Sequence, residues 1–448
     1  MGATTPDHHR HTDPAPGGGP GPTGPAGPDD GTGRPEDEHT EHPDAADALP
    51  VPAEVRARLR HVDHSVLVDE RALDQVRRRF DADQAGALAR YLTSAQSPNT
   101  LRAYRTDWVA FTAWCLAEHR TSLPADPVDV AVYLAAAADT VRADDPDRWA
   151  LSPSTLERKA AAIAAVHGAH GLPSPTRADV VRLTLRGIRR RRRTAPRRKR
   201  PVLLHTLTTL LDHRPEPGHP TGAARARDTL LLLTGFAGAL RRSELAALTF
   251  DDTAVGTDPR TGDPLLVLRL HATKTDQEAR HDHQVALPRG RHRPTCPVCA
   301  FADWADLRTA LRDGGTRALR TALAESAERE HDPRTPHRCH TWTGTDLADG
   351  TARPLFPPVD RHGRIGDRPV SGRAVAELVK RYAHRAGLDP DAFGGHSLRA
   401  GFATQAALSG AADREIMRQG RWTNPRTVHT YIRTANPLED NAVTRLGL

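Results

Sequence analysis

Apolar residues recur at steps of three and four along the chain between residues 52 and 193. The clearest case is the segment 99–118, in which the apolar face consists of Leu101, Tyr104, Trp108, Phe111 and Cys115. This spacing is that of one face of an amphipathic helix. The pattern over 52–193 therefore predicts a small all-helical domain.

The starts of later helices in this region are marked by capping residues. Asp126-Pro127 and Ser152-Pro153 each place a capping side chain before a Pro suited to the first helical position. They predict helices over 128–141 and 154–170. A last helix of the domain is expected over 176–190.

Beyond Pro201 helical and alternating segments are mixed. Residues 265–270 and 283–287 predict two strands joined by a polar turn around Lys274. The expected helices are 203–211, 225–237, 300–312, 372–386, 397–409, 413–419 and 425–433. The stretch 313–354 is rich in Arg, His, Asp and Gly and predicts a partly irregular excursion. A second domain, mixed α/β, is thus expected over 201–448.

Two segments lie outside these domains. Residues 1–50 are dominated by Gly, Pro, Asp, His and Thr. They cannot bury enough apolar surface to offset their chain entropy, so a disordered acidic tail is expected. The segment 194–200 is a basic linker, which either is solvated or lies along a DNA backbone.

The net charge of the chain indicates a class of binding partner. Residues 1–50 contain ten acidic and two basic residues, and because the whole chain carries +7, residues 51–448 carry +15. A nucleic-acid partner is expected from this excess. RNA-binding, ribosomal and membrane-surface proteins are equally basic, so charge alone does not choose between them.

The compartment is predicted from three features. No apolar run is long enough to span a bilayer, and Met1 opens a polar, His-rich segment rather than a signal peptide. The four cysteines give no disulfide framework of the secreted kind. We therefore expect a cytoplasmic protein with no membrane partner.

Candidate chemistry is concentrated near the C-terminus. His396 and Arg399 stand one helical turn apart, and Trp422 is followed nine residues later by Tyr431. Arg241 precedes them by about 150 residues. Each residue alone has an ordinary structural interpretation. Together they supply the nucleophile, the cations and the proton donors and acceptors that breaking a phosphodiester requires.

These motifs resemble those of a known family. The runs 394–404 and 240–245 resemble the two boxes of the tyrosine recombinases, the phage-integrase family. The run 416–424, continued by 431–433, is similar to the Cre-like branch, which carries Trp where most members carry His. The resemblance implies a fold that is mainly α with a small β-sheet in the catalytic domain. It also implies a two-domain DNA clamp, formed by a helical core-binding domain and a mixed α/β integrase catalytic domain.

The resemblance also implies roles for the nucleophile and its neighbours. Tyr431 would attack the scissile phosphate and form a 3′-phosphotyrosyl link. His396 would hydrogen-bond near the phosphate and could accept the phenolic proton. Lys274 matches the hairpin Lys that protonates the leaving 5′-oxygen.

The remaining roles concern the phosphate oxygens. Arg241 and Arg399 would clamp the non-bridging oxygens, and Arg241 is chosen over Arg242 because the Glu of that box stands three residues after the catalytic Arg. Trp422 would donate its indole N–H to one of the same oxygens. Glu244 would help to hold these side chains in place. The alternative is that Glu244 only forms an ion pair on a helix surface.

No cofactor is expected, because the phosphotyrosine link conserves the bond energy. The sequence has neither a phosphate-binding Gly-x-x-x-x-Gly-Lys-Ser/Thr loop nor an obvious carboxylate cluster for two-metal catalysis. Cys296 and Cys299 form a lone Cys-x-x-Cys, and a zinc site would need about two more ligands. His292, Cys339 and His340 are the only candidates considered. Two reduced thiols at a helix start are favoured over bound zinc.

The helical domain offers candidate DNA contacts. The run 98–104 resembles the opening helix of the family's core-binding domain. Thr100, Arg102 and Arg105 lie off its apolar stripe, and Lys159 lies on a later helix. Phosphate or base contacts and solvated helix faces are both compatible with this pattern.

The function expected is that of a site-specific recombinase or integrase, acting in DNA recombination or integration in a mobile element. The family implies double-stranded DNA as partner, a homotetramer on two DNA sites, accessory DNA-bending proteins and a nucleoid location. Residues 434–448 would dock on a neighbouring protomer. Three alternatives stay open: a catalytically silent DNA-binding protein of the same fold, a topoisomerase-like cleaver, and a basic module whose motif is coincidence.

Overall fold

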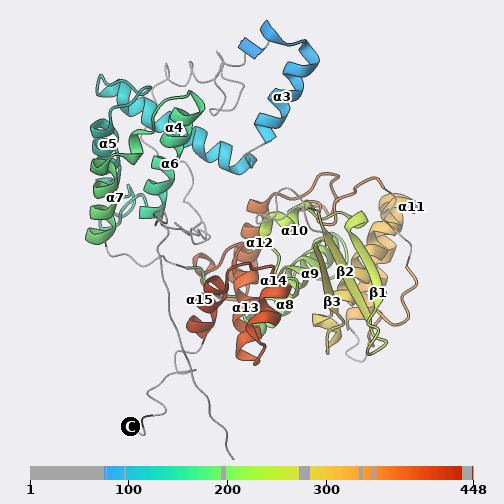
Figure 1. Cartoon of the computed structure of the whole chain (residues 1–448). Coiled ribbons are helices and arrows are strands. Elements are labelled where there is room, and N and C mark those ends of the chain that lie inside the picture. The colour runs from blue at the N-terminus through green and yellow to red at the C-terminus, as the bar shows by residue number, and fades with distance from the viewer. Residues whose placement is uncertain are drawn as a thin grey trace, which may run out of the picture. The chain divides into compact units, whose positions relative to one another are not determined.

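The structure is a computed structural model, and it describes residues 75–76, 78–94, 97–192, 198–271, 283–331, 336–344, 347, 350–435 and 446. Helices dominate these residues, and one small antiparallel sheet accompanies them (Figure 1). The predicted fold class, mainly α with a small sheet, is confirmed. The closing of two domains on DNA stays a prediction, as do the domain boundaries.

The helices of the N-terminal part are α3 (Ala82–Ser94), α4 (Pro98–Ala117), α5 (Pro127–Asp139), α6 (Pro153–Ala169) and α7 (Asp179–Arg192). The predicted caps form: the side chains of Asp126 and Ser152 accept hydrogen bonds from backbone N–H groups at the starts of α5 and α6. The start of α7 was predicted three residues too early, because a 3-10 turn over Pro175–Arg177 precedes it.

The core of this part is formed by α4, α5, α6 and α7. Phe111, Leu134, Leu156 and Ile163 are fully buried there. The apolar stripe predicted on α4 supplies three members of this core, namely Trp108, Phe111 and Cys115.

The helices of the C-terminal part are α8 (Leu204–Asp212), α9 (Gly222–Ala237), α10 (Arg242–Ala247), α11 (Pro297–His331), α12 (Gly372–Arg385), α13 (Ser397–Leu408), α14 (Asp413–Gly420) and α15 (Pro425–Ala435). Helix α9 is the centre of this part, since Leu230 to Leu233 are all buried. It packs against α10, α11 and α13.

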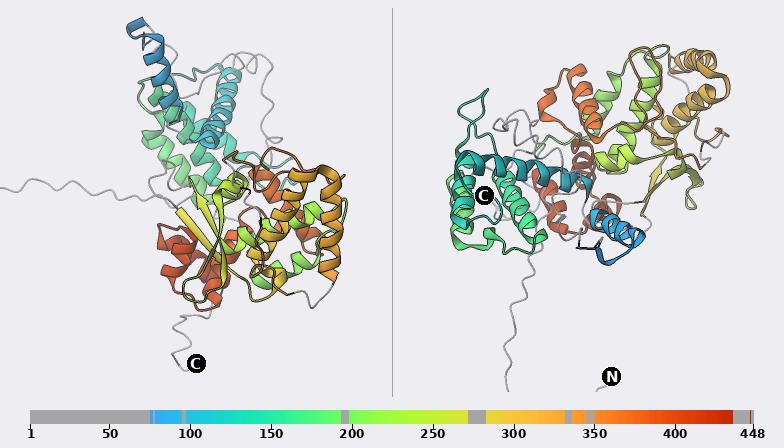
Figure 2. Two further views of the ribbon diagram at one scale, coloured as in Figure 1. Left: turned by 90° about the vertical axis from the view of Figure 1, so that its right-hand side faces the viewer. Right: turned by 90° about the horizontal axis from the view of Figure 1, so that it is seen from above.

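The sheet has the order β1-β2-β3, with β1 (Thr253–Thr257), β2 (Pro264–Leu270) and β3 (His283–Pro288) all antiparallel. In β2 the side chains of Leu266, Leu268 and Leu270 are buried and alternate with more exposed ones, as expected for a strand with one face on a core. Helix α11 packs against β2 and β3 (Figure 2).

Two expectations for this part were wrong. The edge strand β1 was not predicted at all. The helix predicted over 300–312 was expected to end there, but α11 continues to His331, with one non-helical residue at Gly315. A positive φ of 63° is accessible to Gly at that break. The stretch 313–354 is thus partly helical, and its described residues beyond α11 contain no helix.

Among the described residues, no helix combines the length and the apolar character needed to cross a membrane.

Candidate active site

Arg241 and Glu244 form the first part of the site, at the start of α10. The Arg241 backbone N–H donates to Glu244 Oε2 at 2.9 Å, and Arg241 Nη1 donates to Oε1 at 2.7 Å. Glu244 is buried, with only 6% of its surface exposed. The three-residue spacing noted in the sequence is therefore that of a helix cap, in which an acidic side chain satisfies the free N–H before the helix.

Arg421 is a third charged member of this group, and the sequence analysis did not predict it. Its Nη2 donates to Glu244 Oε2 at 2.8 Å, and its Nη1 donates to the carbonyl of Gln419 at 3.0 Å. Glu244 and Arg421 are 177 positions apart. Only the position of Arg421 directly before Trp422 could have drawn attention to it.

Arg399 comes from the first turn of α13 and is 1% exposed. Its Nη1 donates to the carbonyl of Ala239, and its guanidinium lies 4.1 Å from the centre of the Trp422 ring. Its Nη2 is buried and has no hydrogen-bond partner among the described residues. A buried N–H without a partner is costly, so this atom is a donor available to an anion.

Two of the four non-glycine residues with a positive φ in the described structure lie at the same place. Ala239 has a φ of 47° and Arg421 a φ of 56°, in the left-handed region that residues with a side chain rarely adopt. The Ala239 carbonyl accepts from both Arg399 and Arg421. Such strained residues cluster at functional sites, where the surroundings over-determine the backbone.

The electrostatics of the group are dominated by the arginines. Burial alone would raise the pKa of Glu244, but Arg421, Arg241 and Arg399 together hold the pKa of that carboxyl below its usual range. Burial, with the like charge of Arg241 next in importance, lowers the pKa of Arg399 to about 9. Three guanidiniums face one carboxylate, so the group has a surplus of two positive charges near neutral pH.

Tyr431 and His396 form the other side of the site. Tyr431 lies on α15 and is 7% exposed, whereas His396, which directly precedes α13, is exposed. His396 Nε2 lies 3.2 Å from the phenolic oxygen of Tyr431. This distance is within the range for proton transfer between a hydroxyl and a ring nitrogen.

Trp422 connects the two sides. One face of its ring lies against Arg399, and its centre is 5.9 Å from the centre of the Tyr431 ring. The fit depends on Gly420, because a Cβ at that position would lie 1.8 Å from the indole. Trp422 lies between α14 and α15, and the helices α13, α14 and α15 pack against one another (Figure 1).

The structure thus brings together five of the six catalytic candidates: Arg241, His396, Arg399, Trp422 and Tyr431. Glu244 lies among them. The sixth, Lys274, lies outside the described residues. Arg242, which the sequence analysis rejected in favour of Arg241, is exposed.

The four candidate DNA contacts occupy different environments. Arg102 and Arg105 are exposed on α4, while Thr100 lies in its first turn with its hydroxyl 2.8 Å from that of Ser97. Lys159 is buried, and its Nζ lies 3.4 Å from an oxygen of Asp107 and 3.3 Å from the Tyr133 hydroxyl. We therefore do not retain Lys159 as a DNA contact, since its ammonium is engaged inside the helical core.

The described residues contain one group of Cys and His side chains that could hold a metal ion, namely Cys296, Cys299, His337 and Cys339. None of the catalytic candidates belongs to it.

Comparisons with known proteins identify the family of this chain. A sequence profile described as the phage integrase family matches residues 321–437. The integrase/recombinase xerD homolog of Selenomonas ruminantium is 31% identical over 360 residues, covering 80% of this chain and 88% of that protein. This chain belongs to the phage integrase family. The family interpretation of the motifs is confirmed.

Two further proteins are similar to this chain. The recombinase cre of Escherichia phage P1 is 24% identical over 339 residues, which is 75% of this chain and 84% of that protein. A crystal structure of XerH site-specific recombinase bound to palindromic difH substrate has a TM-score of 0.45 and 13% identity, with 88% of this chain and 94% of that chain covered. A likeness at that level carries no weight in the assignment.

Proposed function

We propose that this chain is a site-specific DNA recombinase of the tyrosine type, which cuts and rejoins strands through a 3′-phosphotyrosyl intermediate. Membership of the phage integrase family supports the activity. The observation that carries the proposal is the convergence of Arg241 and Arg421 on Glu244, of Arg399 on the Trp422 ring, and of His396 on Tyr431, whose ring lies beside Trp422.

The surplus of positive charge in the site favours binding of the scissile phosphate. A phosphodiester carries one negative charge, which reduces the surplus left by Arg241, Arg399 and Arg421 around Glu244. The partnerless Nη2 of Arg399 gains an acceptor when a phosphate oxygen enters. We infer that Arg241 and Arg399 bind the non-bridging oxygens and that Trp422 supplies a further donor. Arg421 positions Glu244 rather than touching DNA.

The strand-cleavage step is carried by Tyr431. Its phenolic oxygen attacks phosphorus as His396 Nε2 takes the phenolic proton, and the bond from phosphorus to the 5′-oxygen breaks. The leaving 5′-oxygen receives a proton, which we assign to Lys274 on the motif alone. Rejoining is the reverse step, in which a 5′-hydroxyl attacks the phosphotyrosine.

Assembly and location extend the proposal. We propose double-stranded DNA as the partner, which is supported by the basic charge of residues 51–448 and by membership of the phage integrase family. A homotetramer on two sites, accessory DNA-bending proteins, docking by residues 434–448 and a place on the cytoplasmic nucleoid are further parts of the proposal.

A trapped covalent complex tests the function. A DNA site can be selected from a random library by its binding to Tyr431→Phe. The suicide substrate is this site with a nick placed close to the scissile phosphate. Cleavage then releases a short fragment that diffuses away, so that rejoining is prevented and the covalent complex accumulates. Wild type should accumulate covalent DNA on this suicide substrate, and Tyr431→Phe should bind it without a covalent product. Equal adduct from both, or none from wild type on a site that it binds, would contradict the mechanism. Tight binding without any adduct identifies the silent DNA-binding protein.

The proton donor has its own test. A substrate with a 5′-bridging thiol needs no proton for departure, because a thiolate is a good leaving group. Cleavage by Lys274→Ala should be slow on ordinary DNA and restored on the thiol substrate. No restoration would assign the acid to another residue.

A further inference from the structure

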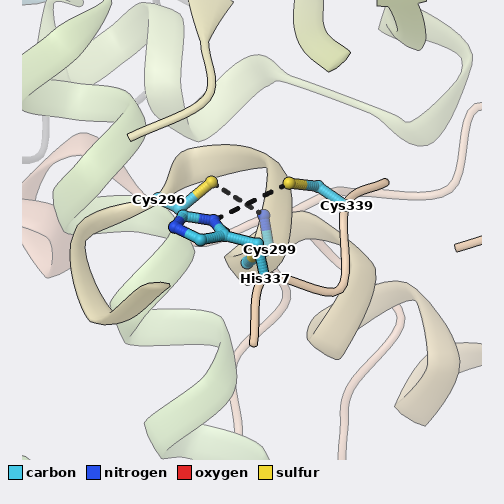
Figure 3. A group of neighbouring side chains, drawn as sticks. All are labelled: Cys296, Cys299, His337 and Cys339. Carbon is cyan, nitrogen blue, oxygen red and sulfur yellow. Dashed lines mark hydrogen bonds between the residues drawn. The ribbon is translucent and has the colours of Figure 1, made fainter. Parts of the chain in front are cut away.

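Four metal-binding side chains meet at the start of α11. Cys296 directly precedes the helix, Cys299 lies in its first turn, and His337 and Cys339 come from a separate segment after its end (Figure 3). Their four candidate ligand atoms all lie within 4.8 Å of one another. The cysteines are almost fully buried and form part of the larger hydrophobic core.

We propose that Cys296, Cys299, His337 and Cys339 bind one structural zinc ion. Three thiolates and one imidazole are a common ligand set for structural zinc, and the two-residue gap in Cys296-Pro297-Val298-Cys299 is the usual spacing of one ligand pair. Each thiol loses its proton to solvent as its sulfur binds, so the occupied site carries a net charge of −1.

Two distances from His337 fit tetrahedral coordination. With Zn–S near 2.3 Å and Zn–N near 2.0 Å, a tetrahedral ion would separate a sulfur from the nitrogen by about 3.6 Å. The observed distances from His337 Nδ1 are 3.5 Å to Cys299 Sγ and 3.8 Å to Cys339 Sγ. Disulfide formation would need two sulfurs to approach to about 2.05 Å, and all four cysteines are free here.

The surroundings orient the ligands. His337 Nε2 lies 3.3 Å from the carbonyl of Arg291, so the ring donates from Nε2 and presents the lone pair of Nδ1 to the sulfurs. The backbone N–H of Cys299 points to Cys296 Sγ at 3.5 Å, an interaction that favours a thiolate, as does the helix start. Gly290 allows the chain to pass closely, because a Cβ there would lie 2.8 Å from the Cα of Cys296.

The segment 336–344 is placed for this role by contacts of its own. Arg338 donates to Asp303 and Asp306, and Trp342 Nε1 donates to Asp306 Oδ1 at 2.8 Å. The ion would therefore join the chain that follows β3, the start of α11 and the segment beyond α11 at one point. His340, which the sequence analysis considered as a ligand, pairs with Asp263 instead, and His292 is exposed.

The simpler interpretation is three buried thiols beside a histidine, since free Cys is commonly buried. It does not account for four ligand atoms from two separate segments that converge within 4.8 Å of one another. The sequence alone favours reduced thiols, because no motif marks His337 as a ligand and the spacing from Cys299 to Cys339 matches no known finger.

Metal content tests the site. The full chain should be purified without a histidine tag, under reducing conditions, from cells supplied with zinc. Elemental analysis should give one zinc per chain for wild type. Cys339→Ser and His337→Ala should lose it, while Cys115→Ser, a buried Cys of the helical part, and His340→Ala should keep it. Every variant retains the His-rich residues 1–50, so zinc bound by that tail cancels in the comparison.

Spectroscopy of the wild-type chain tests the site even if a variant does not fold. X-ray absorption at the zinc edge of wild type should show three sulfur neighbours and one nitrogen, and cobalt in place of zinc should give thiolate-to-cobalt charge-transfer bands. Wild type that contains no zinc and takes up no cobalt would overturn the site. So would a zinc with only nitrogen and oxygen neighbours, or full zinc in Cys339→Ser. A zinc-free chain that still forms the Tyr431 adduct would overturn this site and leave the proposed function intact.

Discussion

Replacement of Glu244 by Gln removes one negative charge from the centre of three guanidiniums while keeping the shape and the capping hydrogen bond. Glu244 pairs with Arg241 at 2.7 Å and with Arg421 at 2.8 Å, and it is buried. Removing one partner from a buried ion pair costs about 3–5 kcal/mol. Because Gln still accepts the Arg241 N–H, we expect the lower end, about 3 kcal/mol.

A matched control exists on α14. Glu415 also stands three residues after the N-cap residue of a short helix and accepts from the backbone N–H of that residue, Ala412, at 2.8 Å. Unlike Glu244, it is exposed and pairs with no arginine in the described structure. Gln serves as well as Glu at this capping position, so Glu415→Gln should change stability by less than about 0.5 kcal/mol. The difference between the two variants isolates the arginine interactions.

Calorimetry without DNA measures the effect. A loss of about 3 kcal/mol should lower the melting temperature of the C-terminal part by about 6–12 °C. The pKa of Glu244 is held below its ordinary value of 4.5, so its contribution is fully present above pH 4.5 and is lost as the pH falls through the lowered pKa. The gap between wild type and Glu244→Gln should therefore close in acid. Equal melting temperatures for Glu244→Gln and Glu415→Gln at pH 7 would refute the reasoning.

Three further outcomes are expected. Gly420→Ala should lower the free energy of unfolding by about 1–3 kcal/mol and abolish adduct formation, because the added Cβ meets the Trp422 indole. The control Gly187→Ala, whose Cβ would have nothing within 4 Å, should show neither effect in calorimetry and cleavage assays. Lys159→Ala should lower stability by about 3 kcal/mol, yet the slope of DNA affinity against salt should not change, whereas a lost phosphate contact would reduce that slope by about one. Trp422→His should cleave the suicide substrate at a rate closer to wild type than Trp422→Phe does, because only His restores a donor; equal rates would remove the donor role.

Local patterns predicted most of the helices. Caps such as Asp126 and Ser152 act within a few residues, so their helices begin within one residue of the expected position. The strand β1 escaped prediction because it is short, contains Gly256 and pairs on one side only. The stretch after residue 313 was expected to be partly irregular because it is rich in Arg, His, Asp and Gly, whereas α11 continues through it to His331 with one non-helical residue at Gly315.

The candidate sites also contain residues that local patterns predicted and residues that they did not. Residues within the motifs, such as His396 and Tyr431, were found because each motif is contiguous in the sequence. Arg421 was not, because its function depends on Glu244, which comes from another element. His337 was missed for the same reason, since the sequence places no pattern around it. Contacts between distant segments are set by packing, and a single sequence does not record them.

The identity of the nucleophile is the central claim, and tandem mass spectrometry of the trapped complex tests it most directly. After protease and nuclease digestion, the account predicts one modified peptide, with the phosphate on Tyr431 linked to the 3′ end of DNA and a free 5′-hydroxyl on the released fragment. A phosphate on any other side chain, or a link to a 5′ end, would contradict it.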